Sequence, residues 1–343
     1  MQPVKTALVG FGISGQCFQA PILQAIDAIA LTAVVSSDAA KVHAQLPEVR
    51  VYPDVATLLA DDSIELVIIA TPNEFHFPYA KAALRAGKHV MVEKPFVIES
   101  KEGRELLAEA EQAGRVLSVY QSRRFDGDFR TLQKLIAEGA LGEVHTFYSS
   151  YNRYRPGTKV RWRESAAPGA GILYDLGAHL IDQAIVLFGR PLSVSATLRH
   201  QRPGAEAVDH FHLVLGYADL DVILHGNCLS TAEGPRFQLF GDKGAFIKYG
   251  MDPQEDFLRA KQGPESEGWG EEDPACYGTL TAADGSTRLI PTERGGYEDC
   301  YLQLMDAIRG ERPVPVSPQQ ALETIAVIEA AYLSQSQQRT VFL

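Results

Sequence analysis

The chain has 343 residues, with 32 Lys and Arg against 43 Asp and Glu, which gives a formal net charge of −11. This length predicts about two domains, and the acidic balance argues against a protein that binds nucleic acid or anionic membranes. Hydrophobic residues at 45% and charged residues at 22% are ordinary for a globular chain, so bulk disorder is excluded.

The cysteines and the apolar segments indicate the cellular setting. The four cysteines lie far apart without a CxxC pair, which fits neither a zinc site nor a disulfide framework. No apolar h-region follows Met1, and no segment reaches the ~18 apolar residues of a membrane span. We therefore expect a reduced, cytoplasmic protein that holds no metal and does not insert in a membrane.

Short apolar runs alternate with helical stretches over the first 120 residues. Because 64–70 is almost continuously apolar, we expect a central parallel strand that is buried on both faces. The alternation predicts an N-terminal α/β domain, residues 1–122, with a doubly wound parallel sheet of the Rossmann type. Its expected strands are 4–9, 31–35, 64–70, 89–92 and 116–120, and its helices are 39–46, 55–60, 77–86 and 101–113.

After Phe125 the strands become longer and alternate between apolar and polar residues. Asp284-Gly285 is a hairpin turn signal between two of them. Residues 123–343 are predicted to form an α+β domain with a mostly antiparallel open sheet. Its expected strands are 194–200, 211–217, 221–226, 237–241, 245–249, 280–282 and 287–290, and its helices are 129–138, 297–309 and 318–334, the last capped by Ser317.

Three glycines in the pattern Gly10-x-Gly12-x-x-Gly15 follow the first strand. Such glycines permit a tight turn, close approach of the backbone to a pyrophosphate, and close packing of helix on strand. The free N–H groups of the following helix then bind phosphate. We therefore expect a dinucleotide site, although Pro21 leaves open whether the first helix is short or kinked.

The end of the second strand indicates which dinucleotide is bound. An acid at this place would hold the ribose hydroxyls of NAD, but the chain has Ser36 and Ser37. Two hydroxyls can hydrogen-bond a 2′-phosphate, so NADP is favoured. Asp38 lies one or two positions late, and we interpret it as the N-cap of the helix that begins at Ala39, the alternative being a ribose ligand.

Two more polar segments follow strands at the same expected edge of the sheet. Ala70-Thr71-Pro72-Asn73 comes after the buried strand, and Glu93-Lys94-Pro95 comes after 89–92. Ligands meet an open α/β sheet at the carboxyl ends of its strands. A plain turn and a solvated surface lysine are the alternative interpretations.

Asp175 and His179 stand four residues apart in an otherwise apolar helical segment. On an α-helix they would share a face, where an acid and an imidazole can orient each other for proton transfer. The alternative is a structural pair satisfied in the core. No third residue with metal-ligand spacing accompanies them, so we predict no metal.

The ordered set of these motifs resembles the glucose–fructose oxidoreductase / inositol dehydrogenase (Gfo/Idh/MocA) family. The segments 151–156, 161–164 and 246–250 resemble its branch of NADP-dependent scyllo-inositol dehydrogenases. The resemblance implies that Lys94, Asp175 and His179 are catalytic. It also implies an NADP site formed by Gly10, Phe11, Gly12, Ile13, Ser14, Gly15, Ser36, Ser37, Ala70, Thr71, Pro72, Asn73, His76, Glu93 and Lys94.

The implied reaction is hydride transfer between the nicotinamide and a ring carbon of a cyclic polyol, with scyllo-inositol and scyllo-inosose as the first candidates. Lys94 and His179 are both candidates to transfer the proton. Another sugar or a dihydrodiol as substrate, and a non-catalytic NADP-binding sensor, are the alternatives. The resemblance also implies that the protein is a homodimer or homotetramer and that its ligand, besides the cofactor, is a small polyol or sugar.

Charge is distributed unevenly along the second half. Residues 152–163 carry five basic residues and no acid, a pattern that fits the lining of a polyol pocket, a subunit contact or a solvated surface. Their Tyr154 and Trp162 are candidate substrate contacts. Residues 252–273 carry eight acids against two basic residues, and we interpret this stretch as a solvated loop.

Overall fold

The computed structural model describes residues 2–343, which divide into two compact units. The first unit contains the residues up to Ser122, together with Pro253–Trp269 and Gly296–Leu322. The second contains Arg123–Asp252, Gly270–Gly295 and Glu323–Leu343. The sequence-based division ran from 123 to the end of the chain, whereas here two later segments belong with the N-terminal residues.

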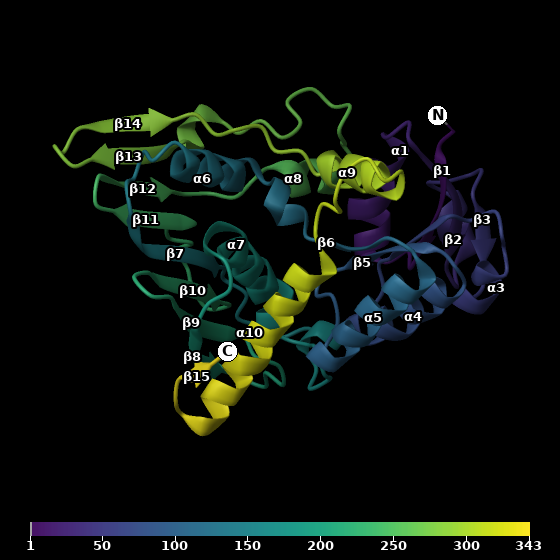
Figure 1. Ribbon diagram of the computed structural model, residues 1–343, viewed down its shortest axis with the longest axis horizontal. Helices are drawn as coiled ribbons and strands as arrows, with labels where there is room; N and C mark the ends of the chain where they lie inside the picture. Colours follow the sequence, from purple (N-terminus) through teal and green to yellow (C-terminus); the bar gives the residue numbers. More distant parts are fainter. Residues whose placement is uncertain (1) are drawn as a thin grey trace. The chain divides into compact units, whose positions relative to one another are not determined.

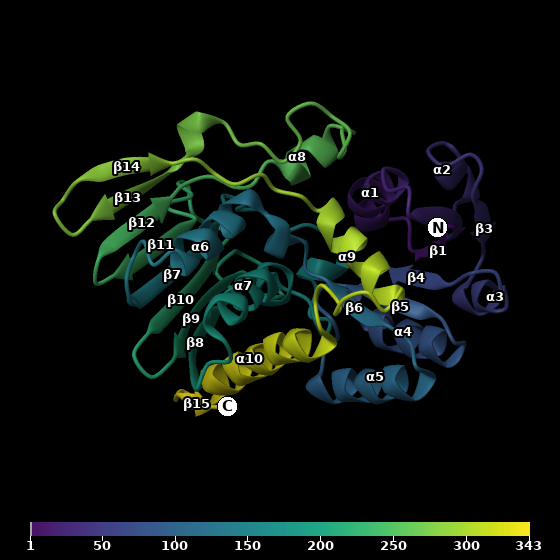
Figure 2. The same cartoon turned by 45° about the horizontal axis from the view of Figure 1, so that its top comes forward.

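The first unit is built on a six-stranded parallel sheet in the order β3-β2-β1-β4-β5-β6 (Figures 1 and 2). The strand order reverses between β1 and β4, and ligands of such sheets bind at this point. The strands are β1 (Val4–Val9), β2 (Ile29–Val35), β3 (Arg50–Tyr52), β4 (Leu66–Ile69), β5 (His89–Glu93) and β6 (Leu117–Tyr120). The helices are α1 (Ala20–Gln24), α2 (Ala39–His43), α3 (Val55–Leu59), α4 (His76–Arg85), α5 (Ser100–Ala113), α8 (Gln254–Arg259) and α9 (Glu298–Ile308).

This sheet confirms the predicted Rossmann-type topology. Every residue of β4 is buried, as its continuous apolar run predicted. The sequence did not indicate β3, because three residues are too few for a periodic pattern. The question left open by Pro21 is also answered: a π-helical turn, Ser14–Gln19, leads into α1, which has only five residues.

The second unit contains a nine-stranded sheet in the order β14-β13-β12-β11-β7-β10-β9-β8-β15. Only β7 and β10 pair in parallel, which confirms the mostly antiparallel sheet. The strands are β7 (Val144–Asn152), β8 (Ser193–Arg199), β9 (His210–Gly216), β10 (Asp221–Asn227), β11 (Phe237–Gly241), β12 (Gly244–Lys248), β13 (Gly278–Ala282), β14 (Thr287–Ile290) and β15 (Val341–Phe342).

Helices α6 (Gly127–Ala137) and α7 (Ala178–Phe188) lie on one face of this sheet in both views (Figures 1 and 2). The alternating burial of β9 and β10 agrees with one covered and one open face. The last helix is α10 (Pro318–Gln337), where the predicted cap is present because Ser317 Oγ accepts a hydrogen bond from Gln320 N at 3.2 Å. In residues 2–343, no helix is long and apolar enough to cross a lipid bilayer.

The interpretation of residues 252–273 as a solvated loop is wrong for much of the stretch. It contains α8, and Asp252, Gln254 and Leu258 are buried. Trp269 is also buried and donates a hydrogen bond from its indole Nε1 to Glu298 at 2.8 Å. The sequence did not indicate α8, because a helix of six residues leaves almost no periodic pattern among so many charged residues.

Candidate functional site

The three glycines form a loop whose geometry requires two of them and leaves space at the third. Gly10 has φ +97°, and a Cβ there would lie 2.6 Å from the carbonyl oxygen of Ala70. A Cβ on Gly15 would lie 2.1 Å from the carbonyl oxygen of Gly10, whereas one on Gly12 would meet nothing within 4 Å. The loop follows β1 at the switch point of the sheet, so this open space fits a dinucleotide pyrophosphate.

Glu93, at the end of β5, connects this loop to Lys94. Its Oε1 accepts hydrogen bonds from Ser14 Oγ at 2.5 Å and from Gln19 Nε2 at 2.7 Å, and its Oε2 accepts one from Lys94 N at 3.0 Å. Tyr301 Oη donates in turn to Gln19 Oε1. Glu93 therefore orients the start of the π-helical turn and the backbone of Lys94 together.

His76 joins the other two predicted segments. Its Nδ1 lies 2.8 Å from the carbonyl oxygen of Pro95, and its Nε2 lies 3.0 Å from that of Thr71. The imidazole is fully buried, and this burial lowers the pKa of His76 although both carbonyls act to raise it. In the neutral ring one nitrogen donates to one of the two carbonyls. His76 thus braces the segments that follow β4 and β5.

The residues that follow β2 show whether Asp38 is a helix N-cap or is available as a ribose ligand. Its Oδ1 accepts a hydrogen bond from Lys41 N at 2.9 Å, so Asp38 is the N-cap of α2, as predicted. Ser36 Oγ accepts one from Asp38 N at 3.1 Å. The Nζ of Lys41 donates to the carbonyl oxygen of Phe11 at 2.9 Å, which brings a positive charge to the glycine loop. The sequence gave no sign of this contact.

The predicted catalytic residues divide between the two units. Lys94 is partly buried in the first unit, and Asp175 and His179 belong to the second. Asp175 lies in a π-helical turn, Leu173–Gly177, whereas the buried His179 lies in the first turn of α7. The expectation of one regular α-helix through both residues is therefore wrong. Single π-helical turns occur often at functional sites.

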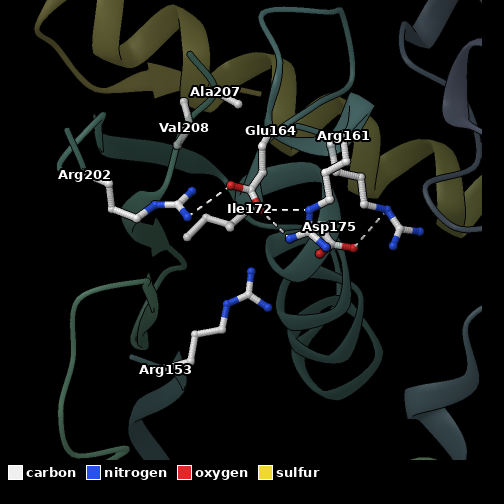
Figure 3. A pocket seen from close by; sticks show the side chains of 10 residues that line it. Arg153, Arg161, Glu164, Ile172, Asp175, Arg202, Ala207 and Val208 are labelled. Atoms are coloured by element: carbon white, nitrogen blue, oxygen red, sulfur yellow. Dashed lines mark hydrogen bonds and ion pairs between the residues drawn. The ribbon is translucent and has the colours of Figure 1, made fainter. Parts of the chain in front are cut away.

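A pocket in the second unit has Asp175 in its wall (Figure 3). Its empty volume is about 270 Å³, and part of this space is open to solvent. Glu164 contacts two arginines there, Arg161 Nε at 2.8 Å and Arg202 Nη1 at 3.1 Å. The lining residues are Arg153, Arg161, Arg163, Glu164, Gly171, Ile172, Asp175, Arg202, Ala207 and Val208.

The two aromatic residues predicted as substrate contacts do not line this pocket. Tyr154 is 58% exposed, and the ring of Trp162 stacks with the guanidinium of Arg163 at 5.1 Å. Three arginines of the same basic segment, Arg153, Arg161 and Arg163, line the pocket instead. Arg202 carried no local signal, because it reaches the pocket from a distant part of the chain. Among residues 2–343, no cluster of His, Cys, Asp and Glu is arranged to hold a metal ion.

A parallel sheet with a glycine loop at its switch point, in one chain with a second α/β unit, is typical of nucleotide-dependent oxidoreductases. Two family models match this chain: "Oxidoreductase family, NAD-binding Rossmann fold" over residues 4–121, and "Oxidoreductase family, C-terminal alpha/beta domain" over residues 133–343. The chain belongs to the Gfo/Idh/MocA family of oxidoreductases, as the motifs predicted.

Full-length relatives agree with this assignment. The chain is 42% identical to scyllo-inositol 2-dehydrogenase (NADP(+)) IolW of Bacillus subtilis, covering 99% of this chain and 96% of the relative. It is 43% identical to the Escherichia coli oxidoreductase YdgJ, with 99% of both chains covered. The structure of the Bacillus subtilis oxidoreductase YvaA matches with a TM-score of 0.96 and 41% identity, covering 99% of this chain and 98% of that one.

Proposed function

We propose that the protein transfers a hydride between NADP(H) and a ring carbon of a cyclic polyol, with scyllo-inositol and scyllo-inosose as the first substrate pair. One observation carries this proposal: Lys94, Asp175 and His179 are present in order in a chain 42% identical, end to end, to a named scyllo-inositol dehydrogenase. A protein that only sensed NADP would have no need of all three side chains.

The residues around the glycine loop fit NADP. The carboxylate of Asp38 caps α2, and it is thereby less available to hold the ribose hydroxyls of NAD. The hydroxyls of Ser36 and Ser37 and the ammonium of Lys41 suit a 2′-phosphate, because they supply hydrogen-bond donors and positive charge. When bound, the dinucleotide supplies or accepts the hydride. Gly10, Gly12 and the partly exposed segment after β4 would hold its phosphates and nicotinamide ribose.

The protein's own residues manage the proton and the charge on the substrate oxygen. Reduction of a ring ketone leaves an alkoxide, which needs one proton. We propose that the ammonium Nζ of Lys94 donates a hydrogen bond to this oxygen and that a ring nitrogen of His179 gives it the proton. The reverse assignment, in which Lys94 gives the proton, is the alternative. Asp175 orients the neighbouring hydroxyls or the imidazole.

Steady-state kinetics with NADPH and scyllo-inosose test the proposal. In Lys94→Met and His179→Ala we expect kcat to fall roughly 10²- to 10⁴-fold, the usual contribution of a positioned acid or base. The matched controls are Lys101→Met and His200→Ala, whose side chains are exposed, and these should keep the wild-type kcat. An unchanged kcat in folded Lys94→Met and His179→Ala would contradict the assignment of catalytic residues.

We also propose that the protein forms a homodimer or homotetramer. The sheet face of the second unit opposite α6 and α7 carries two large aromatic residues, Tyr148 and Phe240, which are 38% and 37% exposed. Their rings meet edge to face at 6.3 Å. Light scattering on the purified protein gives the assembly, and a monomer at micromolar concentration would contradict the proposal.

A further inference from the structure

The pocket that contains Asp175 carries more positive than negative charge. Four arginines line it, Arg153, Arg161, Arg163 and Arg202, against the carboxylates of Glu164 and Asp175. A third carboxylate, Asp209, accepts a hydrogen bond from Arg202 Nε at 3.0 Å. Four guanidinium groups against three carboxylates leave one positive charge in excess, in a protein whose formal net charge is −11.

Glu164 and Asp209 already form ion pairs with Arg161 and Arg202. Glu164 bridges Arg161 and Arg202, and Asp209 pairs with Arg202. Burial acts to raise the pKa of Glu164, but the hydrogen bond from Lys159 N and the charges of Arg161 and Arg202 outweigh it and lower the pKa, which keeps this acid ionised. Neither carboxylate is therefore free to neutralise a further guanidinium.

Arg153 is the arginine that remains without a partner. Its side chain makes no hydrogen bond and no ion pair with residues 2–343, and its Nε is shielded from solvent. Figure 3 shows its guanidinium pointing from the end of β7 toward Ile172 and Asp175. Arg163, which also lines the pocket, is only loosely paired, because its Nε lies 3.9 Å from Asp175 Oδ1, beyond hydrogen-bond distance.

The neighbouring Arg155 is affected by two of these arginines. Its burial, and next the charges of Arg153 and Arg161, lower the pKa of its guanidinium. Like charges this close repel one another, and an anion among them would relieve the repulsion. A neutral polyol would leave the partly shielded charge of Arg153 uncompensated, which is unfavourable.

We propose that this pocket binds an anionic group of the substrate, a carboxylate or a phosphate, with Arg153 as its main anchor and Arg163 as a second contact. The planar guanidinium group suits either anion, because its parallel N–H groups match pairs of oxygens. The pocket shares Asp175 with the residues to which we assign the reaction, so the anion and the reacting carbon belong to one molecule. This inference rests on the hydride transfer proposed above and changes its substrate: acidic polyols or sugars take the place of the neutral scyllo-inositol pair.

Binding of simple anions tests the inference without turnover. Calorimetry with saturating NADP+, which occupies the cofactor phosphate sites, measures the affinity of inorganic phosphate and of D-glucuronate for the wild type, Arg153→Gln and Arg190→Gln. Loss of a charge-assisted hydrogen bond weakens binding roughly 10- to 100-fold, and we expect this loss in Arg153→Gln. Arg190 is exposed and lies outside the pocket, so Arg190→Gln should bind like the wild type.

The two anions distinguish the source of the charge. Binding of phosphate alone indicates a phosphorylated substrate, and binding of glucuronate alone indicates a sugar acid. Absence of binding by both anions, or equal affinity in the wild type and Arg153→Gln, overturns the inference. Reduction of scyllo-inosose is measured separately: turnover without anion binding overturns the inference and leaves the proposed function intact. Anion binding without turnover of any ring ketone supports the anion site and contradicts the proposed hydride transfer.

Discussion

Replacing Glu93 with glutamine tests whether this side chain organises the cofactor loop. The carboxylate accepts three hydrogen bonds, from Ser14 Oγ, Gln19 Nε2 and Lys94 N, at 2.5, 2.7 and 3.0 Å. An amide has one oxygen and one NH₂ group in place of two acceptor oxygens. Whichever way the amide is turned, at least one of these donors faces another donor.

The cost follows from this arrangement. If the amide oxygen takes the place of Oε1, the N–H of Lys94 loses its acceptor, and the other two bonds lose the strength that a charged acceptor gives. A partly buried donor without a partner costs about 1–3 kcal/mol. We therefore expect Glu93→Gln to lower the free energy of unfolding by about 2 kcal/mol and Tm by roughly 5 °C. We also expect weaker NADPH binding and a lower kcat.

Thermal unfolding, NADPH titration and kinetics on the same samples measure these effects. The matched control is Glu111→Gln on α5, where the side chain is exposed and makes no hydrogen bond within the described residues. A Glu93→Gln protein with the Tm and NADPH affinity of Glu111→Gln would refute the reasoning. A lower Tm with unchanged NADPH affinity would limit Glu93 to a structural role.

Two further predictions concern the cofactor and the pH. Ser36→Asp should reduce the ratio of kcat/KM for NADP+ to that for NAD+ by roughly 100-fold or more, because the new carboxylate repels a 2′-phosphate a few ångströms away; an unchanged ratio would show that Ser36 does not face this phosphate. Burial, and next the charges of His210 and His212, lower the pKa of His225 from 6.5 to about 4. The unfolded chain then binds more protons than the folded one between these values, so the free energy of unfolding should fall as the pH drops from ~6.5 to ~4. His225→Gln should flatten this fall in Tm, whereas the exposed-site control His200→Gln should not, and parallel curves for wild type and His225→Gln would contradict the assignment.

Patterns contained in one short segment predicted the fold well. The apolar run of β4 and the glycines after β1 are each recognisable from a few consecutive residues. The sequence therefore predicted the parallel sheet and its phosphate loop. The N-cap role of Asp38 is similarly local, since it depends on the next three residues. Segment α8 was missed because its order comes from packing against residues elsewhere in the first unit, including the stacking of Arg259 on Phe18.

The candidate site was predictable only where its motif residues are contiguous. Lys94 and Glu93 were predicted, but the residues that orient them were not, because Gln19 and Tyr301 are 282 positions apart and meet only in the folded chain. For the pocket, the sequence showed only that residues 152–163 are basic. It could not show that Arg202 pairs with Glu164 or that the side chain of Arg153 has no partner among the described residues, because these facts depend on which residues meet in the folded chain.

The interleaved path of the chain has a consequence for how the protein is made and recombined. The chain passes between the two units five times, and a nascent chain that ends at Ser122 already contains all six strands of the parallel sheet. It still lacks Val316, whose carbonyl accepts a hydrogen bond from Ser118 Oγ at 3.0 Å, and Tyr301, whose ring packs against Tyr120 at 5.2 Å. These two contacts can form only after the chain has been synthesised past Val316 and Tyr301, respectively. Exchange of halves between homologous genes at this position would therefore separate residues that contact each other within a single core.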